Sequence, residues 1–481
     1  MKGADAVLRK QLWIGGSWRE AKAYEELRSP YSGELLAEIA LAGAEETQDA
    51  IAAAHAARQA MRAMPSHERA AILERVASAL NARRDEAARL IAAEAAKPLK
   101  YALAEVDRTV QTYKFSAEEA KRIHGETIAL DAAPGGEGRL AYTKREPLGV
   151  IGAITPFNFP MNLVAHKVGP AIAAGNTVVL KPAEQTPLSA LFIGELFHEA
   201  GLPAGALNIV TGHGHVAGEA IVTDERVAKL TFTGSPEVGK SIRAKAGLKR
   251  VTLELGSNAA LIVDKDVDVP RIIARCVMGA FSNQGQVCIS LQRVYVHEAL
   301  FEAFARQFVE FASRLKLGDP LDPDTDVSAM IAEKEARRAL AWIEEAKAAG
   351  ANVRLGGVIE GGMLKPTVVT DAGDTLQVSC KEIFAPVVVL HKVGSMEEAF
   401  QRVNDSRYGL QAGIYTNSLQ MALRAADELQ VGGVMINDIP TFRVDHMPYG
   451  GVKESGLGRE GIRYAVEEMT ELKLVVINRN E

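Results

Sequence analysis

The hydrophobic and polar positions of the first 123 residues follow two successive patterns. Residues 11–16 and 29–34 carry the glycine, proline and serine punctuation that is typical of β-hairpins. From residue 44 to 123 the chain is rich in alanine, glutamate and arginine, and its apolar positions recur at helical spacing. Pro65 and Pro98 interrupt that spacing, because proline breaks the interior of a helix. We therefore predict short strands followed by three or four helices.

Between residues 148 and 256, short β-branched apolar runs alternate with segments of helical spacing. A second alternating region extends from residue 259 to about residue 433. Alternation of this kind predicts parallel sheets with helices on their faces, which is an α/β fold. The strands expected in the first region are Val150–Ile154, Thr177–Leu180, Ala206–Val210 and Lys229–Phe232.

The segment 125–146 loses the helical pattern, and its Pro134-Gly135-Gly136 turn divides two extended stretches. We predict a hairpin arm here that takes part in oligomer formation. The chain ends in a further apolar run, residues 472–477, which is typical of a strand.

Length, charge and cysteine usage narrow the classes of protein. At 481 residues the chain is too long for one core, and its net charge of −6 argues against a nucleic-acid-binding face. The start, Met1–Asp5, lacks a signal-peptide pattern, and no uncharged apolar run reaches about 18 residues, so no membrane span is expected. Three widely spaced cysteines form neither a disulfide framework nor a metal cluster, which suits a reducing compartment. We expect a cytoplasmic protein without a metal site.

One of these cysteines, Cys288, lies in a short polar segment that contains a glycine. The segment separates a helix-like run, Ile272–Phe281, from a strand-like run, Arg293–His297. Polar loops between regular elements are where reactive groups tend to be presented. A single cysteine is nevertheless more often a small buried hydrophobe than a nucleophile. The segment alone leaves both interpretations open.

Four consecutive predicted strand ends carry residues that suit a nucleotide. Lys181 and Glu184 follow the second strand and could hydrogen-bond adjacent ribose hydroxyls, although alone they could be a solvated surface pair. The third strand opens into Gly212–Gly218, whose G-x-G-x-x-x-G spacing is one residue longer than the usual dinucleotide fingerprint. After the fourth, Ser235 could cap a helix whose N-terminus attracts a phosphate. Together these strand ends favour a nucleotide site at the carboxyl edge of the sheet.

A glutamate, Glu254, stands between two leucines and precedes Gly256. In such apolar surroundings desolvation disfavours the charged carboxylate and raises its pKa. That suits a general base working near neutral pH.

Seven motifs, in this order and spread over nearly the whole chain, resemble the signature series of the NAD(P)-dependent aldehyde dehydrogenase superfamily. A match at seven sites is highly specific, and it favours the nucleophile interpretation of Cys288. The motifs are Phe157–Pro160, Lys181–Glu184, Phe232–Ser235, Leu253–Gly256, Gly285–Cys288, Glu382–Pro386 and Pro448–Gly451.

The resemblance implies a role for each matched residue. Cys288 would attack the aldehyde as a thiolate, and Asn158 with the Cys288 backbone N–H would hold the developing oxyanion. Glu254 would activate water to hydrolyse the thioester, and Lys181 is counted with these catalytic residues. The implied cofactor contacts are Ile154, Thr155, Pro156, Phe157, Lys181, Ala183, Glu184, Gly214, Gly218, Phe232, Gly234, Ser235, Gly256, Glu382 and Phe384.

The resemblance also implies the domain organisation and the assembly. A Rossmann-type NAD domain would comprise residues 1–124 and 147–255, and an α/β catalytic domain residues 256–460. Residues 125–146 and 461–481 would form a small β oligomerisation arm that extends a neighbour's sheet, giving a homodimer or homotetramer.

Two acidic residues, Glu184 and Glu254, bear on which cofactor is used and which product is released. The Glu184 carboxylate would repel the 2′-phosphate of NADP, so NAD should be preferred, with NADP possible. Because CoA-dependent relatives lack the base that Glu254 supplies, hydrolysis to a free acid is expected. Ala385 stands where the family more often has glycine, and we expect only a local change there.

Arg108, Asn162, His166 and Arg443 are the expected substrate-binding residues. Asn162 and His166 share a helix face, and the two arginines could bind a carboxylate, phosphate or sulfonate. Alternatively, Arg108 pairs with acids on its own helix, Arg443 pairs with Asp445, and His166 is a packing residue. Compatible substrates are phosphonoacetaldehyde, sulfolactaldehyde, glyceraldehyde-3-phosphate, lactaldehyde and succinate semialdehyde.

Other classes stay open at this point. The chain could be a broad-specificity aliphatic or aromatic aldehyde dehydrogenase, a thiol esterase, or a catalytically idle scaffold of the same fold. Cys276 is expected to be buried packing, and Cys380 could approach Cys288 closely enough for a regulatory disulfide.

Overall fold

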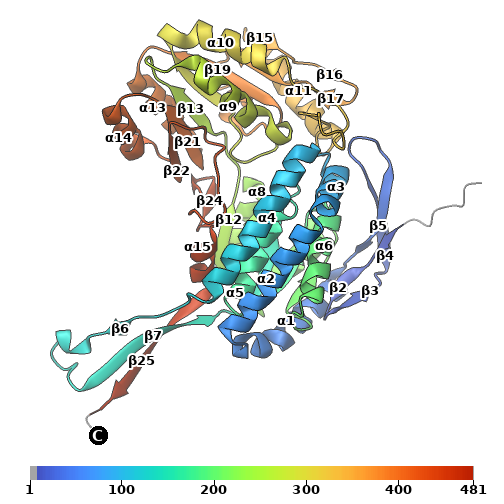
Figure 1. Cartoon of the computed structure of the whole chain (residues 1–481), viewed down its shortest axis with the longest axis vertical. Helices are drawn as coiled ribbons and strands as arrows, with labels where there is room; N and C mark the ends of the chain where they lie inside the picture. The colour runs from blue at the N-terminus through green and yellow to red at the C-terminus, as the bar shows by residue number, and fades with distance from the viewer. Residues whose placement is uncertain (1–7, 480–481) are drawn as a thin grey trace, which may run out of the picture.

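The computed structural model describes residues 8–479, which form two stacked α/β bodies with a long β arm projecting from one of them (Figure 1). The chain start, for which no signal peptide was expected, lies outside the described residues. Among the described helices, none is both long and apolar enough to cross a membrane.

The first body is built on an eight-stranded sheet of order β24-β12-β11-β8-β9-β10-β2-β3. Strands β8 to β12 are parallel and run in the order β10-β9-β8-β11-β12, which is a dinucleotide-binding arrangement with its switch point beside β8. All four predicted strands are confirmed. The strands are β2 Leu12–Ile14, β3 Ser17–Arg19, β8 Val150–Ile154, β9 Thr177–Lys181, β10 Leu207–Ile209, β11 Val227–Thr233, β12 Arg250–Glu254 and β24 Gly456–Leu457.

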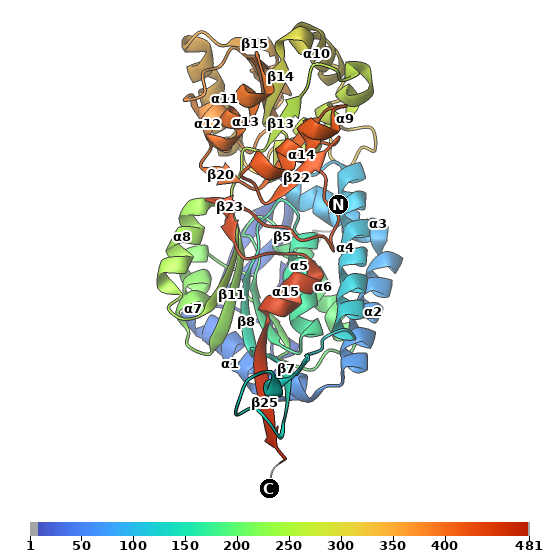
Figure 2. The same cartoon turned by 90° about the vertical axis from the view of Figure 1, so that its left-hand side faces the viewer.

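Helices cover both faces of this sheet (Figure 2). α5 and α6 pack on one face beneath α2 to α4, while α1, α7 and α8 lie on the other, so a hydrophobic core forms on each side. Pro65 and Pro98 stand immediately before α2 and α4, as predicted, and a further break falls at Arg83. The helices are α1 Ala44–Ala63, α2 Ser66–Ala82, α3 Arg84–Ala95, α4 Leu99–Ala120, α5 Asn162–Ala173, α6 Pro187–Glu199, the π-turn Gly214–Gly218, α7 Glu219–Thr223, α8 Pro236–Lys245 and α15 Ile462–Glu468.

The second body contains a seven-stranded sheet of order β15-β18-β19-β14-β13-β21-β22, in which β15 alone is antiparallel. α9 and α10 pack on one face, and α13 and α14 on the other. Its elements are β13 Ala260–Val263, α9 Val269–Phe281, the 3₁₀ turn Ser282–Gly285, β14 Arg293–His297, α10 Glu298–Ala312, α11 Glu333–Ala348, β15 Asn352–Leu355, β16 Ile359–Glu360, β17 Met363–Leu364, β18 Thr367–Thr370, α12 Gln377–Cys380, β19 Val387–Val393, α13 Met396–Asn404, β20 Tyr408–Gly409, β21 Gln411–Tyr415, α14 Leu419–Glu428, β22 Gly433–Ile436 and β23 Val452–Lys453.

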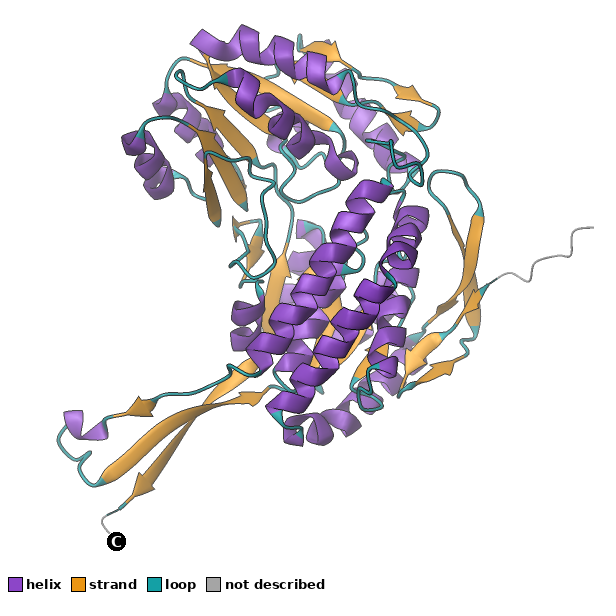
Figure 3. Ribbon diagram, in the orientation of Figure 1, coloured by secondary structure: helices purple, strands orange, loops and turns teal. Residues whose placement is uncertain are grey.

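The arm is the three-stranded sheet β25-β7-β6, in which the last strand of the chain pairs along the whole of β7 (Figure 3). The predicted hairpin and terminal strand are therefore confirmed. A second small sheet, β1-β5-β4, flanks the first body. These strands are β1 Arg9–Lys10, β4 Ala23–Arg28, β5 Leu35–Leu41, β6 Thr127–Ile128, β7 Arg139–Pro147 and β25 Thr470–Asn478, and the 3₁₀ turn Leu130–Ala132 lies within the hairpin.

Two predicted domain boundaries need correction. β24 was expected in the catalytic domain, but it pairs with β12 at the edge of the first sheet. α15 was expected in the arm, but it packs against α5 of the first body through buried Ile462, Ala465 and Val466. α15 belongs to the first body because its apolar side chains are buried there, whereas β24 belongs to it through backbone pairing with β12.

Candidate active site

Cys288 follows a strained turn that joins α9 to β14. Asn283, Gln284 and Gly285 have φ angles of 50°, 55° and 68° in succession. Residues other than glycine rarely adopt this backbone conformation. A Cβ at Gly285 would lie 2.1 Å from the Ala385 carbonyl oxygen. Such strain persists only where surrounding structure enforces it, and it tends to mark functional sites. The turn therefore fixes the position of Cys288.

The Cys288 side chain lines two cavities, one of about 440 Å³ and one of about 200 Å³. Its Sγ lies 3.0 Å from the Tyr449 hydroxyl. Burial raises the pKa of the Cys288 thiol to about 11, against the lowering effects of the Tyr449 hydrogen bond and of Arg443. At neutral pH the resting group is thus a thiol, and the expected thiolate has to form during the reaction.

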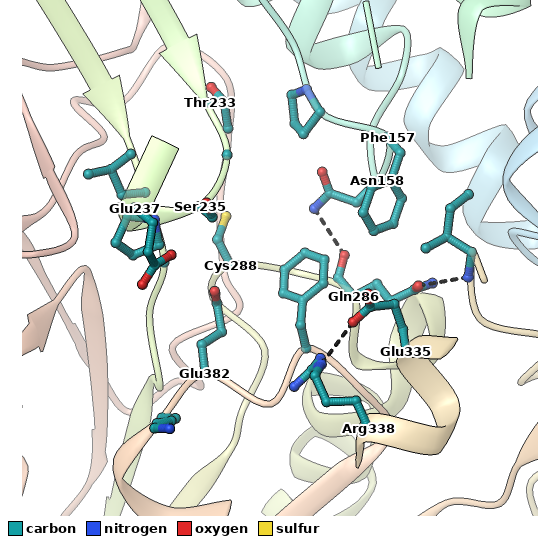
Figure 4. A pocket seen from close by; sticks show the side chains of 18 of the residues that line it. Phe157, Asn158, Thr233, Ser235, Glu237, Gln286, Cys288, Glu335, Arg338 and Glu382 are labelled. Atoms are coloured by element: carbon teal, nitrogen blue, oxygen red, sulfur yellow. Dashed lines mark hydrogen bonds and ion pairs between the residues drawn. The ribbon is translucent and has the colours of Figure 1, made fainter. Parts of the chain in front are cut away.

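Asn158 follows β8 and lies against the turn that carries Cys288. Its Nδ2 donates to the Gln286 carbonyl at 3.0 Å, and Asn283 Nδ2 donates to the Asn158 carbonyl at 3.2 Å. Figure 4 shows Asn158 and Cys288 at the same cleft. A buried amide N–H next to the thiol is the donor that a developing oxyanion requires.

Glu254 is the last residue of β12, and its carboxylate is buried. Neither oxygen has a hydrogen-bond partner within residues 8–479. Burial raises the pKa of Glu254 well above its ordinary value, nearby Glu460 raises it further, and Arg443 opposes both. Burying a carboxylate without a hydrogen-bond partner costs free energy of folding, so such a group is usually kept for a function. Glu254 therefore fits the predicted general base. It lies outside the lining of both cavities, beside Gly450.

The larger cavity is lined by seven of the predicted cofactor contacts (Figure 4). Ser235 Oγ caps α8 by accepting from the Val238 N–H, and the first residues of this helix line the cavity, so the helix N-terminus faces it. A Cβ at Gly256 would lie 2.7 Å from a Glu382 oxygen, which shows how closely the backbone approaches there. These features fit an extended dinucleotide. The seven are Pro156, Phe157, Gly234, Ser235, Gly256, Glu382 and Phe384.

Glu382 and Phe384 are held in place at this cleft. The Glu382 carboxylate accepts from the Ser257 N–H at 2.9 Å, and burial raises its pKa to about 7. The Phe384 ring packs edge-on against Phe157, with ring centroids 5.9 Å apart. The acid and the aromatic ring thus line the same cavity as Cys288.

The smaller cavity is lined by three of the four predicted substrate residues, Arg108, Asn162 and Arg443, together with Cys288. The Arg443 guanidinium lies over the Tyr449 ring at 3.6 Å. Its Nε is buried and has no hydrogen-bond partner in the described part of the chain. A donor without an acceptor beside the thiol suits a polar substrate group.

A sequence model of the aldehyde dehydrogenase family matches residues 18–475. This chain belongs to that family. It is 46% identical over 478 residues to a 3-sulfolactaldehyde dehydrogenase of Priestia aryabhattai, covering 99% of this chain and 100% of the relative.

Two solved structures extend the comparison. Aldehyde dehydrogenase 21 of Physcomitrella patens, in complex with the reaction product succinate, matches with a TM-score of 0.96 at 41% identity, covering 98% of this chain and 99% of that one. Glyceraldehyde-3-phosphate dehydrogenase GapN of Methanocaldococcus jannaschii, complexed with NADP, has a TM-score of 0.92 at 38% identity, covering 95% and 100%. The predicted family, fold and enzyme class are confirmed: the chain is an NAD(P)-dependent aldehyde dehydrogenase.

The remaining predicted cofactor contacts of this aldehyde dehydrogenase lie at the neighbouring strand ends, outside the lining of the larger cavity. A Cβ at Gly218 would lie 3.7 Å from Lys181 and 3.9 Å from Ile154, so these three are adjacent. Burial lowers the pKa of Lys181 to about 8. A catalytic role for Lys181 stays a prediction, because it lines neither cavity that Cys288 lines. The residues concerned are Ile154, Thr155, Lys181, Ala183, Glu184, Gly214, Gly218 and Phe232.

The substrate end of the dehydrogenase requires corrections. His166, expected at the aldehyde entrance, is buried behind it with Nε2 2.8 Å from Asp445. Arg108 pairs with Asp445 through two hydrogen bonds of 3.0 and 2.6 Å, and not with acids on its own helix. Arg443 pairs with Glu460 at 3.0 Å, and not with Asp445. The partner of Arg108 was missed because it lies 337 residues away in the sequence. The partner of Arg443 lies 17 residues away and was missed because no local pattern links the two positions.

Tyr449 was not singled out from the sequence, and Asp445 was considered only as a partner of Arg443. Tyr449 belongs to one of the seven motifs, which was a usable signal, but its contact with Cys288 joins positions 161 residues apart. Asp445 also accepts from Asn162 Nδ2 at 2.9 Å. Its only signal was its position two residues after Arg443.

The other two cysteines line neither of the cavities that Cys288 lines. Cys276 is buried in the core of the second body, as expected. Cys380 is a free thiol and lines a different cavity from Cys288. The disulfide considered from the sequence is not formed.

Proposed function

We propose that this dehydrogenase oxidises a small aldehyde that carries an anionic group, using NAD, and releases the carboxylic acid. One observation carries the proposal: Cys288 opens onto a cavity of about 200 Å³ whose lining includes Arg108 and Arg443. The volume suits a short substrate, and guanidinium groups suit a carboxylate, sulfonate or phosphate. The P. aryabhattai relative is named for a sulfonated aldehyde, and the P. patens structure holds a dicarboxylate product, which supports the same class.

In the proposed reaction, Cys288 loses its proton to water as it attacks the aldehyde carbon. Asn158 Nδ2 and the Cys288 N–H would then stabilise the oxyanion of the thiohemiacetal. NAD(P), when bound in the larger cavity, supplies the acceptor for the hydride. Collapse leaves a thioester on Cys288, and Glu254 would remove a proton from the water that hydrolyses it. The raised pKa of Glu254 supports this role, because a carboxylate with a higher pKa is a stronger base.

A preference for NAD over NADP is part of the proposal. Glu184 lies after β9, where an acid meets the adenosine ribose hydroxyls in sheets of this order. Burial would raise the pKa of Glu184, but the hydrogen bonds from the Gly214 N–H and His213 outweigh it and the pKa is lowered. A carboxylate there repels a 2′-phosphate.

The proposed assembly is a homodimer or homotetramer built through the arm. β25 is an edge strand, and its Leu472, Leu474 and Val476 side chains are 46–54% exposed. An edge strand with an apolar face is a template for pairing with another chain.

The proposal is tested by comparing kcat/KM for 3-sulfolactaldehyde, succinate semialdehyde and butanal in the wild type and in Arg108→Gln. We expect the two anionic aldehydes to be preferred. Arg108→Gln should lower their kcat/KM roughly 10- to 100-fold, the value of a charge-assisted hydrogen bond, and should change butanal little. Arg122→Gln, at an exposed arginine beyond α4, is the matched control. Equal kcat/KM for all three aldehydes, unchanged in Arg108→Gln, would refute the proposal.

A further inference from the structure

His213 stands between two carboxylates at the adenosine end of the cofactor site. Its Nδ1 is 3.3 Å from Glu184 Oε2, and its Nε2 is 3.2 Å from Glu25 Oε1. A neutral imidazole carries one N–H and can donate to only one of these acids. An imidazolium donates to both. The geometry therefore fits the protonated form of His213.

Within residues 8–479, His213 lies within hydrogen-bond distance of the Glu184 carboxylate, and Lys181 also lowers the pKa of that carboxyl. The His215 ring stacks on His213, with centroids 5.5 Å apart. Lys181 is buried behind the loop, where its Nζ donates to the Pro182 carbonyl. Beyond these, α1 packs against the π-turn that follows His213, and its two first-turn acids have partners of their own. Glu45 pairs with Lys22 at 2.6 Å, and Glu46 accepts from the Gly43 N–H at 2.9 Å.

The position of Glu184 gives this contact its significance. β9 lies next to the central strand β8, and Glu184 follows β9 at its carboxyl end. In a sheet of this order, an acid at that point hydrogen-bonds the ribose 2′-hydroxyl, where NADP would instead place a phosphate. Glu184 also accepts from the Gly214 N–H at 2.9 Å, which holds the carboxylate beside His213.

We propose that His213 sets how strongly this dehydrogenase rejects NADP: as an imidazolium it neutralises Glu184, and loss of its proton sharpens the preference for NAD. The inference rests on the proposed role of Glu184 in NAD preference. The hydrogen bond to Glu184 raises the pKa of His213, and Glu25 raises it further. His213 is therefore charged below this raised pKa, and its charge is lost as pH rises through it. Discrimination against NADP should increase with pH.

The effect should be modest, because all three side chains meet solvent. His213, Glu184 and Glu25 are 35%, 46% and 57% exposed, so water and salt screen their interactions. Pairs of this kind alter affinity about two- to five-fold. Low ionic strength makes the change easier to measure.

The test measures binding without turnover. Dissociation constants of NAD and NADP are determined by calorimetry with Cys288→Ser enzyme between pH 5.5 and 8.5, alone and combined with His213→Asn, Glu25→Gln or, as control, His67→Asn. With His213 present, we expect the ratio of the NADP to the NAD constant to rise about two- to five-fold more with pH than it does in His213→Asn. The 2′-phosphate of NADP also loses a proton in this pH range. Subtracting the slope measured with His213→Asn removes that contribution. Glu25→Gln should move the midpoint to lower pH, since Glu25 raises the pKa of His213. His67→Asn, on an exposed surface, should match its parent.

The outcomes distinguish a failure of the His213 proposal from a failure of the proposed preference for NAD. Equal pH slopes with and without His213, while NAD remains preferred, would overturn the role of His213 alone. NADP binding as tight as NAD at every pH would overturn the proposed NAD preference. If His213→Asn also loses NAD binding, the Glu25→Gln variant provides the test. An unchanged pH midpoint of the NADP-to-NAD ratio in that variant would overturn the inference.

Discussion

At the scale of single residues, the active site depends on a thiol that its surroundings keep neutral. Burial raises the pKa of Cys288 to about 11, while the Tyr449 hydroxyl and Arg443 lower it. The sequence suggested a reactive cysteine but not this balance. Which charges meet a side chain depends on contacts between residues that are far apart along the chain.

Removing the Tyr449 hydroxyl should make Cys288 less reactive. In Tyr449→Phe the hydrogen bond that lowers the thiol pKa is lost, so the pKa rises and the thiolate fraction at pH 8 falls. We expect alkylation of Cys288 by iodoacetamide at pH 8 to slow roughly ten-fold, which corresponds to about one pKa unit. Tyr31→Phe, at an exposed tyrosine, is the control. An unchanged alkylation rate would show that the 3.0 Å contact has no effect on the thiol.

At the scale of elements, much of the architecture could be predicted from local patterns. Pro65 and Pro98 correctly marked breaks between helices, and the apolar β-branched runs correctly marked the parallel strands. The pairing of β24 with β12 could not be predicted, because two residues carry no periodicity. The strained turn before Cys288 was also missed, since Asn283 and Gln284 have no intrinsic preference that forces a left-handed conformation.

Gly285 should tolerate no side chain. In Gly285→Ala the new Cβ would overlap the Ala385 carbonyl and adopt a positive φ, so the turn has to move. We expect a lower thermal midpoint, a loss of about 1–3 kcal/mol of stability, and a large fall in kcat. Gly373→Ala is the matched control, because a Cβ there meets no described atom within 4 Å. Wild-type activity in Gly285→Ala would mean that the turn does not fix Cys288.

At the scale of the whole molecule, the sequence predicted the arm but not the hydrogen-bond network that Asp445 forms beside the smaller cavity. The arm was predictable, because a loss of helical pattern and a terminal strand are local signals. The network was not. Asp445 joins Arg108 of α4 to His166 of α5, and these positions meet only once both bodies have folded.

Charges on the arm should break the proposed assembly. Leu474 and Val476 lie on one face of β25 and are 54% and 46% exposed. We expect the double variant Leu474→Glu, Val476→Glu to have a smaller mass by light scattering, since paired apolar surface would have to bury two carboxylates. Val358→Glu, at a half-exposed valine outside the arm, should keep the wild-type mass. An unchanged mass in the double variant would exclude this face of the arm from the interface.

The central claim is that Cys288 forms a thioester which Glu254 releases by activating water. Intact-protein mass spectrometry of Glu254→Gln, mixed with NAD and succinate semialdehyde, tests it most directly. We expect the acyl group to accumulate on Cys288 with about one NADH per subunit and then near-arrest, because general-base catalysis contributes roughly 10²- to 10⁴-fold. Cys288→Ser should give neither adduct nor NADH. Sustained NADH production by Cys288→Ser, or full turnover without an adduct in Glu254→Gln, would contradict the account.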